Sequence, residues 1–215
     1  MLNPALPPTL SAAMPPLSDP DFAQVCPGIW VWHAYDPSVK TDLFSTALAT
    51  PSGIYLVDPI PLSGLHLTAL TGTGSVAGVI LTNANHQRSA LDYSDRFSVP
   101  VFGQPDTLAT IQPGRPGDLS SIARDLEAFE IPGAVTGEIT FYQPSSGGTL
   151  IVGDALINLE AYGFTFLPAK YCQDQKQMRR SLRQLMSLPV ERILFAHGTP
   201  IVARASERLR ALLGS

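Results

Sequence analysis

The stretch Leu81–Ala90 (LTNANHQRSA) begins where the apolar run Val76–Leu81 (VAGVIL) ends. That run has the continuous hydrophobic pattern of a buried strand. The polar residues after it lead into a predicted helix that ends near Phe97. The passage is therefore a strand, a polar loop and a helix, and it is one of four landmarks whose order along the chain identifies the fold.

Two further landmarks are acidic residues at predicted strand ends. Asp58 ends the strand in Leu56–Pro59 (LVDP), and Asp154 follows the strand in Gly148–Leu156 (GTLIVGDAL), behind Pro132–Phe141 (PGAVTGEITF). The last landmark is Ile193–Pro200 (ILFAHGTP), which places His197 at the end of a strand that follows a predicted helix.

Taken together and in this order, the four landmarks resemble the metallo-β-lactamase fold superfamily. The resemblance runs from about Gly28 to the C-terminus and implies an α+β fold, an αββα four-layer sandwich of two mixed β-sheets flanked by helices. It also implies a site at the strand ends between the sheets. We expect one such domain over residues 24–215, after a Pro-rich N-terminal arm over residues 1–23 that can form neither a helix nor a central strand.

The site residues depart from the family pattern. The motif His-x-His-x-Asp-His aligns with Asn83, Asn85, Gln87 and Arg88, and the next metal-binding histidine aligns with Ala134. Of the family's ligands, the resemblance leaves Asp154 and His197. The complete site uses five histidines and this chain has four in total, so a standard two-metal centre cannot form. We expect no cofactor, or at most one divalent metal ion: zinc, iron or manganese.

Our first hypothesis is a superfamily member that has lost its two-metal centre. Arg88 carries a permanent positive charge, and we expect it to pair with Asp154 in place of the second metal. The residual polar pocket would bind a small anionic or polar ligand. It would comprise Asn83, Asn85, His86, Gln87, Arg88, Ala134, Asp154 and His197.

The alternative is a divergent hydrolase for an ester, thioester or lactone, and it depends on His86. His86 could turn inward and form a three-ligand site for one metal with Asp154 and His197, or act as a general base without metal. Otherwise His86 begins the following helix and faces solvent or caps a backbone group. We favour this outward position, because Arg88 fills the space, and catalytic residues stay unassigned.

Residues around the motif receive supporting roles. We expect Asp58 to hold the motif loop by hydrogen bonds without binding metal itself, and His197 to line the pocket beside Asp154. The stretch Gly163–Gln173 follows the Asp154 turn, and this position makes Phe166, Lys170 and Tyr171 candidates for the pocket wall.

Composition excludes several classes of partner. The net charge is −4, so neither nucleic acid nor an anionic membrane is an expected partner, and no apolar run reaches the roughly 18 residues of a membrane span. The basic stripe Lys176, Arg179, Arg180 and Arg183 is interpreted as a solvated helix face.

Cys26 and Cys172 are expected to be free thiols. The N-terminus lacks the pattern of a secretory signal, which favours the cytoplasm. The sequence favours no oligomeric state.

Overall fold

The computed structural model describes residues 21–122, 124 and 126–214. The first twenty residues of the predicted Pro-rich arm lie outside this part of the chain. The described chain begins with strand β1 (Asp21–Cys26), which the sequence had not indicated. β1 pairs antiparallel with the next strand and so forms one edge of the first sheet.

The first sheet has six strands in chain order, from β1 to β6. Its strands β1 to β4 are antiparallel, while β5 and β6 run parallel to β4. Helices α1 and α2 make the two parallel crossovers. The bounds are β2 (Ile29–Asp36), β3 (Thr41–Thr50), β4 (Gly53–Val57), α1 (Gly64–Thr71), β5 (Val76–Ile80), α2 (Ala90–Phe97) and β6 (Val101–Phe102).

The second sheet has four strands in the order β12-β9-β8-β7, with β12 and β9 parallel. A separate two-stranded hairpin, β10 and β11, follows β9. The strand bounds are β7 (Glu127–Glu130), β8 (Ile139–Gln143), β9 (Thr149–Val152), β10 (Leu156–Leu159), β11 (Gly163–Phe166) and β12 (Arg192–Phe195). The helices are α3 (Pro105–Ile111), α4 (Gln175–Leu182) and α5 (Ala205–Leu213), and single turns of 3-10 helix include η1 (Leu119–Ser121), η2 (Ser145–Gly147), η3 (Ala169–Tyr171) and η4 (Arg183–Ser187).

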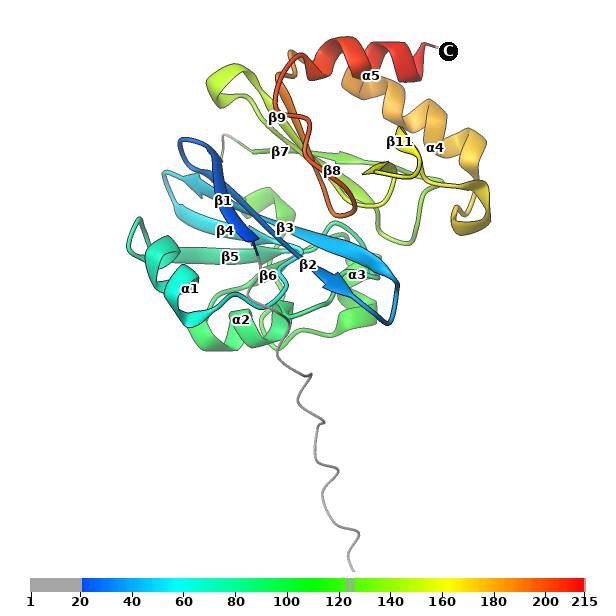
Figure 1. The fold of residues 1–215 in the computed structure, drawn as a ribbon. Helices are drawn as coiled ribbons and strands as arrows, with labels where there is room; N and C mark the ends of the chain where they lie inside the picture. Colours follow the sequence, from blue (N-terminus) through cyan, green and yellow to red (C-terminus); the bar gives the residue numbers. More distant parts are fainter. Residues whose placement is uncertain (1–20, 123, 125, 215) are drawn as a thin grey trace, which may run out of the picture.

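The elements form an αββα sandwich (Figure 1). Three layers of buried hydrophobic side chains lie between its helices and sheets. The alternation along each strand divides its side chains between two layers. In β9, Ile151 faces the core between the sheets, whereas Leu150 and Val152 face α4 and α5. In β2, Trp32 faces α1 and α2 on the opposite side of the molecule. The expected α+β architecture of two mixed sheets flanked by helices is confirmed.

Most predicted elements are present, with two kinds of difference. The predicted helix that carries the basic stripe ends as α-helix at Leu182, and the chain continues as η4. The strands β7, β10 and β11 were not predicted, since each has four residues and too little alternation to distinguish it from a loop. Both cysteines are free, and the basic stripe of α4 and η4 is exposed. Within the described residues, no helix is long and apolar enough to span a membrane.

Candidate metal centre

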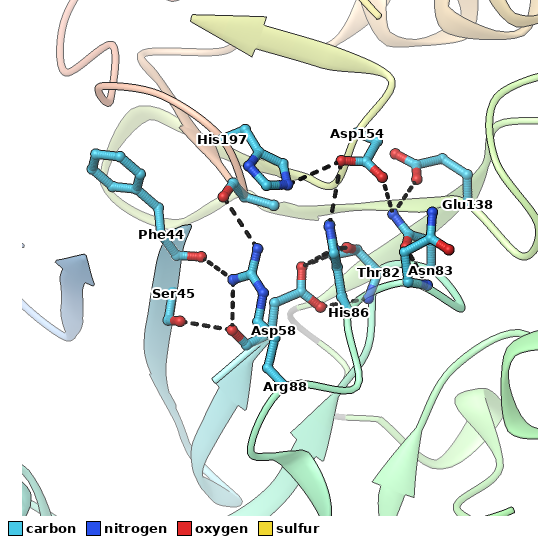
Figure 2. Close-up of polar contacts among 12 residues, drawn as sticks. Phe44, Ser45, Asp58, Thr82, Asn83, His86, Arg88, Glu138, Asp154 and His197 are labelled. Atoms are coloured by element: carbon cyan, nitrogen blue, oxygen red, sulfur yellow. Dashed lines mark hydrogen bonds and ion pairs between the residues drawn. The ribbon is translucent and has the colours of Figure 1, made fainter. Parts of the chain in front are cut away.

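The candidate site lies where four strands end at the junction of the two sheets. Asp58 follows β4, and the motif loop follows β5. From the second sheet, Asp154 follows β9 and His197 follows β12. The two sheets meet here directly, because the backbone N–H of Phe44 in β3 donates to the carbonyl of Ala196 at 3.0 Å. Chain segments far apart in sequence thus bring their polar side chains into one place (Figure 2).

His86 points into this junction, and its expected outward position is therefore wrong. Its surface is 3% exposed, and its Nε2 lies 3.3 Å from Oδ1 of Asp154. His197 approaches the same carboxylate oxygen from the second sheet, with its Nε2 also at 3.3 Å. A single oxygen atom of Asp154 therefore faces two imidazole nitrogens.

Asp58 fixes the orientation of His86 from behind. The Nδ1 atom of His86 lies 2.9 Å from Oδ2 of Asp58, and the backbone N–H of Thr82 donates to Oδ1 of Asp58 at 2.8 Å. The Thr82 hydroxyl donates to Oδ2 of the same carboxylate. With Nδ1–H directed at a carboxylate, Nε2 is the nitrogen that faces Asp154. A carboxylate placed in this way behind an imidazole is typical of histidines that bind metal ions.

Arg88 does not form the ion pair with Asp154 that we expected from the sequence. Its guanidinium reaches backbone carbonyls instead: Nη1 donates to Phe44 and, at 2.9 Å, to Asp58, and Nη2 donates to Ala196 at 3.2 Å. These three carbonyls belong to β3, to the end of β4 and to the end of β12. Arg88 therefore ties the motif loop to both sheets, and its charge acts on Asp154 only through space.

Asn83 and Ala134, two of the aligned ligand positions, are both fully buried, and neither is among the residues that line the pocket. The Nδ2 atom of Asn83 donates to Oδ2 of Asp154 at 3.1 Å and to Oε2 of Glu138 at 2.8 Å. Oε1 of Glu138 accepts from the backbone N–H of Ala155 at 2.9 Å. Ala134 is fully buried and offers no donor atom. Sequence reasoning missed Glu138, because its partners Asn83 and Ala155 are distant in the sequence and meet it only in the folded protein.

The other predicted pocket residues separate into two groups. Asn85, Lys170 and Tyr171 line the pocket, whereas Gln87 is an exposed residue whose carbonyl accepts a hydrogen bond at the start of α2. Phe166 was expected in the wall but is buried in the core of the second sheet, under the guanidinium of Arg179.

The charges of the site balance without a metal ion. Burial lowers the pKa of His86, but Asp154 and Asp58 outweigh this and raise it to about 9. Burial disfavours charge on the two aspartates, yet His86 holds the pKa of each below its ordinary value. Burial and the charge of His86 lower the pKa of His197 to about 4. Burial and the neighbouring Asp154 raise the pKa of Glu138 to about 8. Near pH 7, two anions therefore face two cations, His86 and Arg88.

The pocket above these residues has a volume of about 930 Å³. His86, Asp154 and His197 are at its floor, and the β2–β3 turn, the β10–β11 hairpin and η3 form its rim. Most of the wall is apolar, which is usual for small-molecule sites. The apolar wall residues are Val39, Leu43, Ile60, Pro61, Val135, Ile157, Leu159, Leu167 and Pro168, with Tyr162 and Tyr171 at the rim.

The three residues at the floor fit a metal ion. Within the described chain they are the one group of histidine, cysteine, aspartate and glutamate residues that could hold a metal, with donor atoms within 4.8 Å of one another. Two imidazoles and a carboxylate are zinc-type ligands. In a tetrahedron with bonds of about 2.0–2.1 Å, donors stand about 3.3 Å apart. Two of the three separations, His86 to Asp154 and His197 to Asp154, have this length.

Comparison with solved structures supports the fold. A metallo-β-lactamase from Pontibacter korlensis is 16% identical, with a TM-score of 0.69 over 92% of this chain and 100% of that one. The metallo-β-lactamase FIM-1 from Pseudomonas aeruginosa, solved in a mono-zinc form, is 15% identical, with a TM-score of 0.69 over 94% and 98% of the chains. A metallo-β-lactamase family protein from Thermus thermophilus is 21% identical, with a TM-score of 0.57 over 87% and 80%.

No curated protein sequence matches the chain. A family model described as the metallo-β-lactamase superfamily, however, matches residues 23–215, which is nearly all of the chain that the structure describes. The match agrees with the αββα layers and with a polar site at the strand ends between the sheets. The chain belongs to the metallo-β-lactamase superfamily.

Proposed function

We propose that this protein is a hydrolase that works with one divalent metal ion held by His86, Asp154 and His197. The observation that carries the proposal is the inward position of His86, with Asp58 behind its Nδ1 and with Nε2 3.3 Å from Asp154. A histidine that merely starts a helix has no need of a buried carboxylate that directs its second nitrogen at another carboxylate. This arrangement favours the hydrolase alternative over our first hypothesis.

A single metal ion is consistent with the rest of the site. Oδ2 of Asp154, the oxygen left for another metal ion, accepts a hydrogen bond from Asn83 instead, and the aligned ligand position Ala134 has no donor atom. Neutral amide groups are weak ligands for zinc. The FIM-1 structure is of a mono-zinc form, so one bound metal is compatible with this fold.

In the proposed hydrolysis, each residue of the site would have a separate role. A divalent ion held at the floor supplies Lewis-acid activation of water and of a substrate carbonyl. Asp58 keeps the proton of His86 on Nδ1, so that Nε2 is free to bind metal. Asn83 holds Asp154 by Oδ2, which leaves Oδ1 directed at both histidines. The apolar wall limits access of bulk water, and the bond cleaved is an ester, thioester or lactone bond.

A metal-free ligand pocket is the second candidate, and the charge balance favours it. Asp58 and Asp154 are compensated by protonated His86 and by Arg88, so the site carries no uncompensated charge that would require a metal ion. In this case, His86 Nε2 would keep its proton and Asp154 would accept it. The pocket would then bind a polar or anionic molecule without cleaving it.

Metal content distinguishes the two candidates. Tag-free protein is loaded with zinc, iron or manganese, dialysed and measured by plasma mass spectrometry. We expect about one equivalent of metal, lost in His86→Ala and in His197→Ala and kept in the control His66→Ala, which removes a histidine from α1. The loaded protein should cleave ester, thioester or lactone substrates, and the two site variants should not. Stoichiometry near zero after loading would reject the metal-dependent hydrolase and leave the metal-free pocket.

A further inference from the structure

We propose that the pocket accepts an amphiphilic anion, a molecule whose apolar body lies along the wall while its negatively charged group lies at the rim beside Lys40 and Lys170. This inference rests on the proposed function for the position of the reactive bond, at the floor near His86 and His197. It narrows the substrate to an ester, thioester or lactone that carries an anionic group away from the reactive carbonyl.

The rim combines exposed apolar side chains with lysines. Val39 and Lys40 are neighbours on the β2–β3 turn, and Lys170 and Tyr171 are neighbours on η3. Val39 and Tyr171 are each 57% exposed, and Tyr162 on the β10–β11 hairpin is 70% exposed. Half of the large hydrophobic residues that are exposed in the described chain thus surround the mouth of one pocket. Apolar groups gathered in this way mark a binding surface.

Lys40 and Lys170 are exposed cations at the rim, and the ammonium of Lys170 lies 4.6 Å from the centre of the Tyr171 ring. The guanidinium of Arg88 also borders the pocket, but it already donates to the carbonyls of Phe44, Asp58 and Ala196. Asp36 is the acidic residue of the rim, and its carboxylate accepts hydrogen bonds from the backbone and hydroxyl of Ser38. The rim therefore has an excess of one positive charge on a protein whose net charge is −4. Charge complementarity favours an anionic group at this position.

The wall favours an apolar body over a compact polar anion. Between the rim and the floor, the pocket is lined by aliphatic residues of β3, β10 and the loop before η3, such as Leu43, Ile157 and Leu167. An inorganic anion at the rim would leave this surface in contact with water. A chain of several methylene groups would cover this surface and remove it from water, which is favourable for each methylene group that is buried. Only a molecule with both parts satisfies wall and rim together.

Binding can be measured without any hydrolysis. Octyl phosphate, octanol and inorganic phosphate are titrated separately by isothermal calorimetry, below the micelle concentration, into chelator-treated and metal-loaded protein. We expect octyl phosphate to bind at least tenfold more tightly than either octanol or phosphate. In the double variant Lys40→Gln/Lys170→Gln its affinity should fall about fivefold or more, with octanol unchanged. The control Lys176→Gln, on the exposed face of α4, should stay within twofold of the original protein.

Three results would overturn the inference: equal affinity for octyl phosphate and octanol, equal affinity for octyl phosphate and inorganic phosphate, or a double variant that behaves like the control. Binding of anionic phospholipid vesicles without binding of monomeric octyl phosphate would also overturn it, in favour of a membrane surface. Failure of the proposed function gives a different pattern. In that case, the protein holds no metal and cleaves nothing, yet octyl phosphate still binds with the dependence on Lys40 and Lys170.

Discussion

Replacing Arg88 tests whether one guanidinium holds the motif loop against both sheets. In Arg88→Met the side chain keeps much of its length but loses all three hydrogen bonds to the carbonyls of Phe44, Asp58 and Ala196. A hydrogen bond from a charged donor is worth roughly 1.5–3 kcal/mol, so three of them set an upper limit of several kcal/mol. Bonds that share one donor group do not add fully.

Two of the three carbonyls keep another partner after the substitution, and this lowers the expected cost. The carbonyl of Asp58 still accepts from the hydroxyl of Ser45, and that of Ala196 still accepts from the backbone N–H of Phe44. The main losses are the bond to the Phe44 carbonyl and the attraction between Arg88 and the buried aspartates. We therefore expect a loss of about 3 kcal/mol in the free energy of unfolding.

Urea unfolding, followed by tryptophan fluorescence, measures this loss. Trp30 and Trp32 are both buried, so their emission reports the tertiary structure. With a slope of about 2–3 kcal/mol per M, the midpoint should fall by about 1–1.5 M urea. Arg88→Lys should lose roughly half as much, since an ammonium cannot span three carbonyls. The control Arg208→Met is on the exposed face of α5. If Arg88→Met shifts the midpoint no more than the control, Arg88 is not a structural tie.

Three further substitutions test the surroundings of the site. Asp58→Asn should weaken metal binding about 10- to 100-fold in a chelator competition, because the support behind a metal-binding histidine is lost, while exposed Asp42→Asn should not. Gly198→Ala should lower the free energy of unfolding by about 3 kcal/mol or more in a urea titration, because its φ is +108° and a Cβ would lie 2.2 Å from the carbonyl oxygen of Asn158; a loss below about 1 kcal/mol would contradict this. For metal-free protein, Glu138→Gln should flatten the pH profile of stability. The raised pKa of Glu138, about 8 against 4.5, contributes stability that is present below pH 4.5 and is lost as pH rises through 8, so equal slopes for variant and original would exclude this role.

The fold could be predicted because its evidence is local in the sequence. The apolar run before the motif loop predicted β5, and Asp58, Asp154 and His197 each follow a strand that the hydrophobic pattern marks clearly. The short strand β7 was missed because its residues, Glu127–Glu130, are largely exposed and show no alternation that would distinguish them from a loop.

The direction of side chains at the site could not be predicted from the motif alignment. Arg88 aligns with a ligand position, which suggested that it would take the place of a metal. Its guanidinium instead donates hydrogen bonds to the carbonyls of Phe44 in β3 and Ala196 after β12. These two carbonyls lie close together only because the two sheets pack against each other. Glu138 shows the same limit, because a buried carboxylate that bonds Asn83 and Ala155 is recognisable only once β8 lies beside β9.

The position of His86 has a physical explanation in the backbone of two loops, the one that follows β4 and the motif loop that carries His86. Asp58 and Arg88 both adopt positive φ values, 46° and 40°, which are uncommon for residues other than glycine and cost of order 1–3 kcal/mol each. These two turns lie where Asp58 meets Nδ1 of His86 and where the loop bends into α2. The backbone N–H of Thr82 donates to the Asp58 carboxylate, and Arg88 donates to three carbonyls; these hydrogen bonds hold the two turns in place. A strained loop supported in this way directs a histidine from a non-ligand position of the motif at Asp154. Counting ligands along the motif therefore misses a histidine that the fold places 3.3 Å from Asp154.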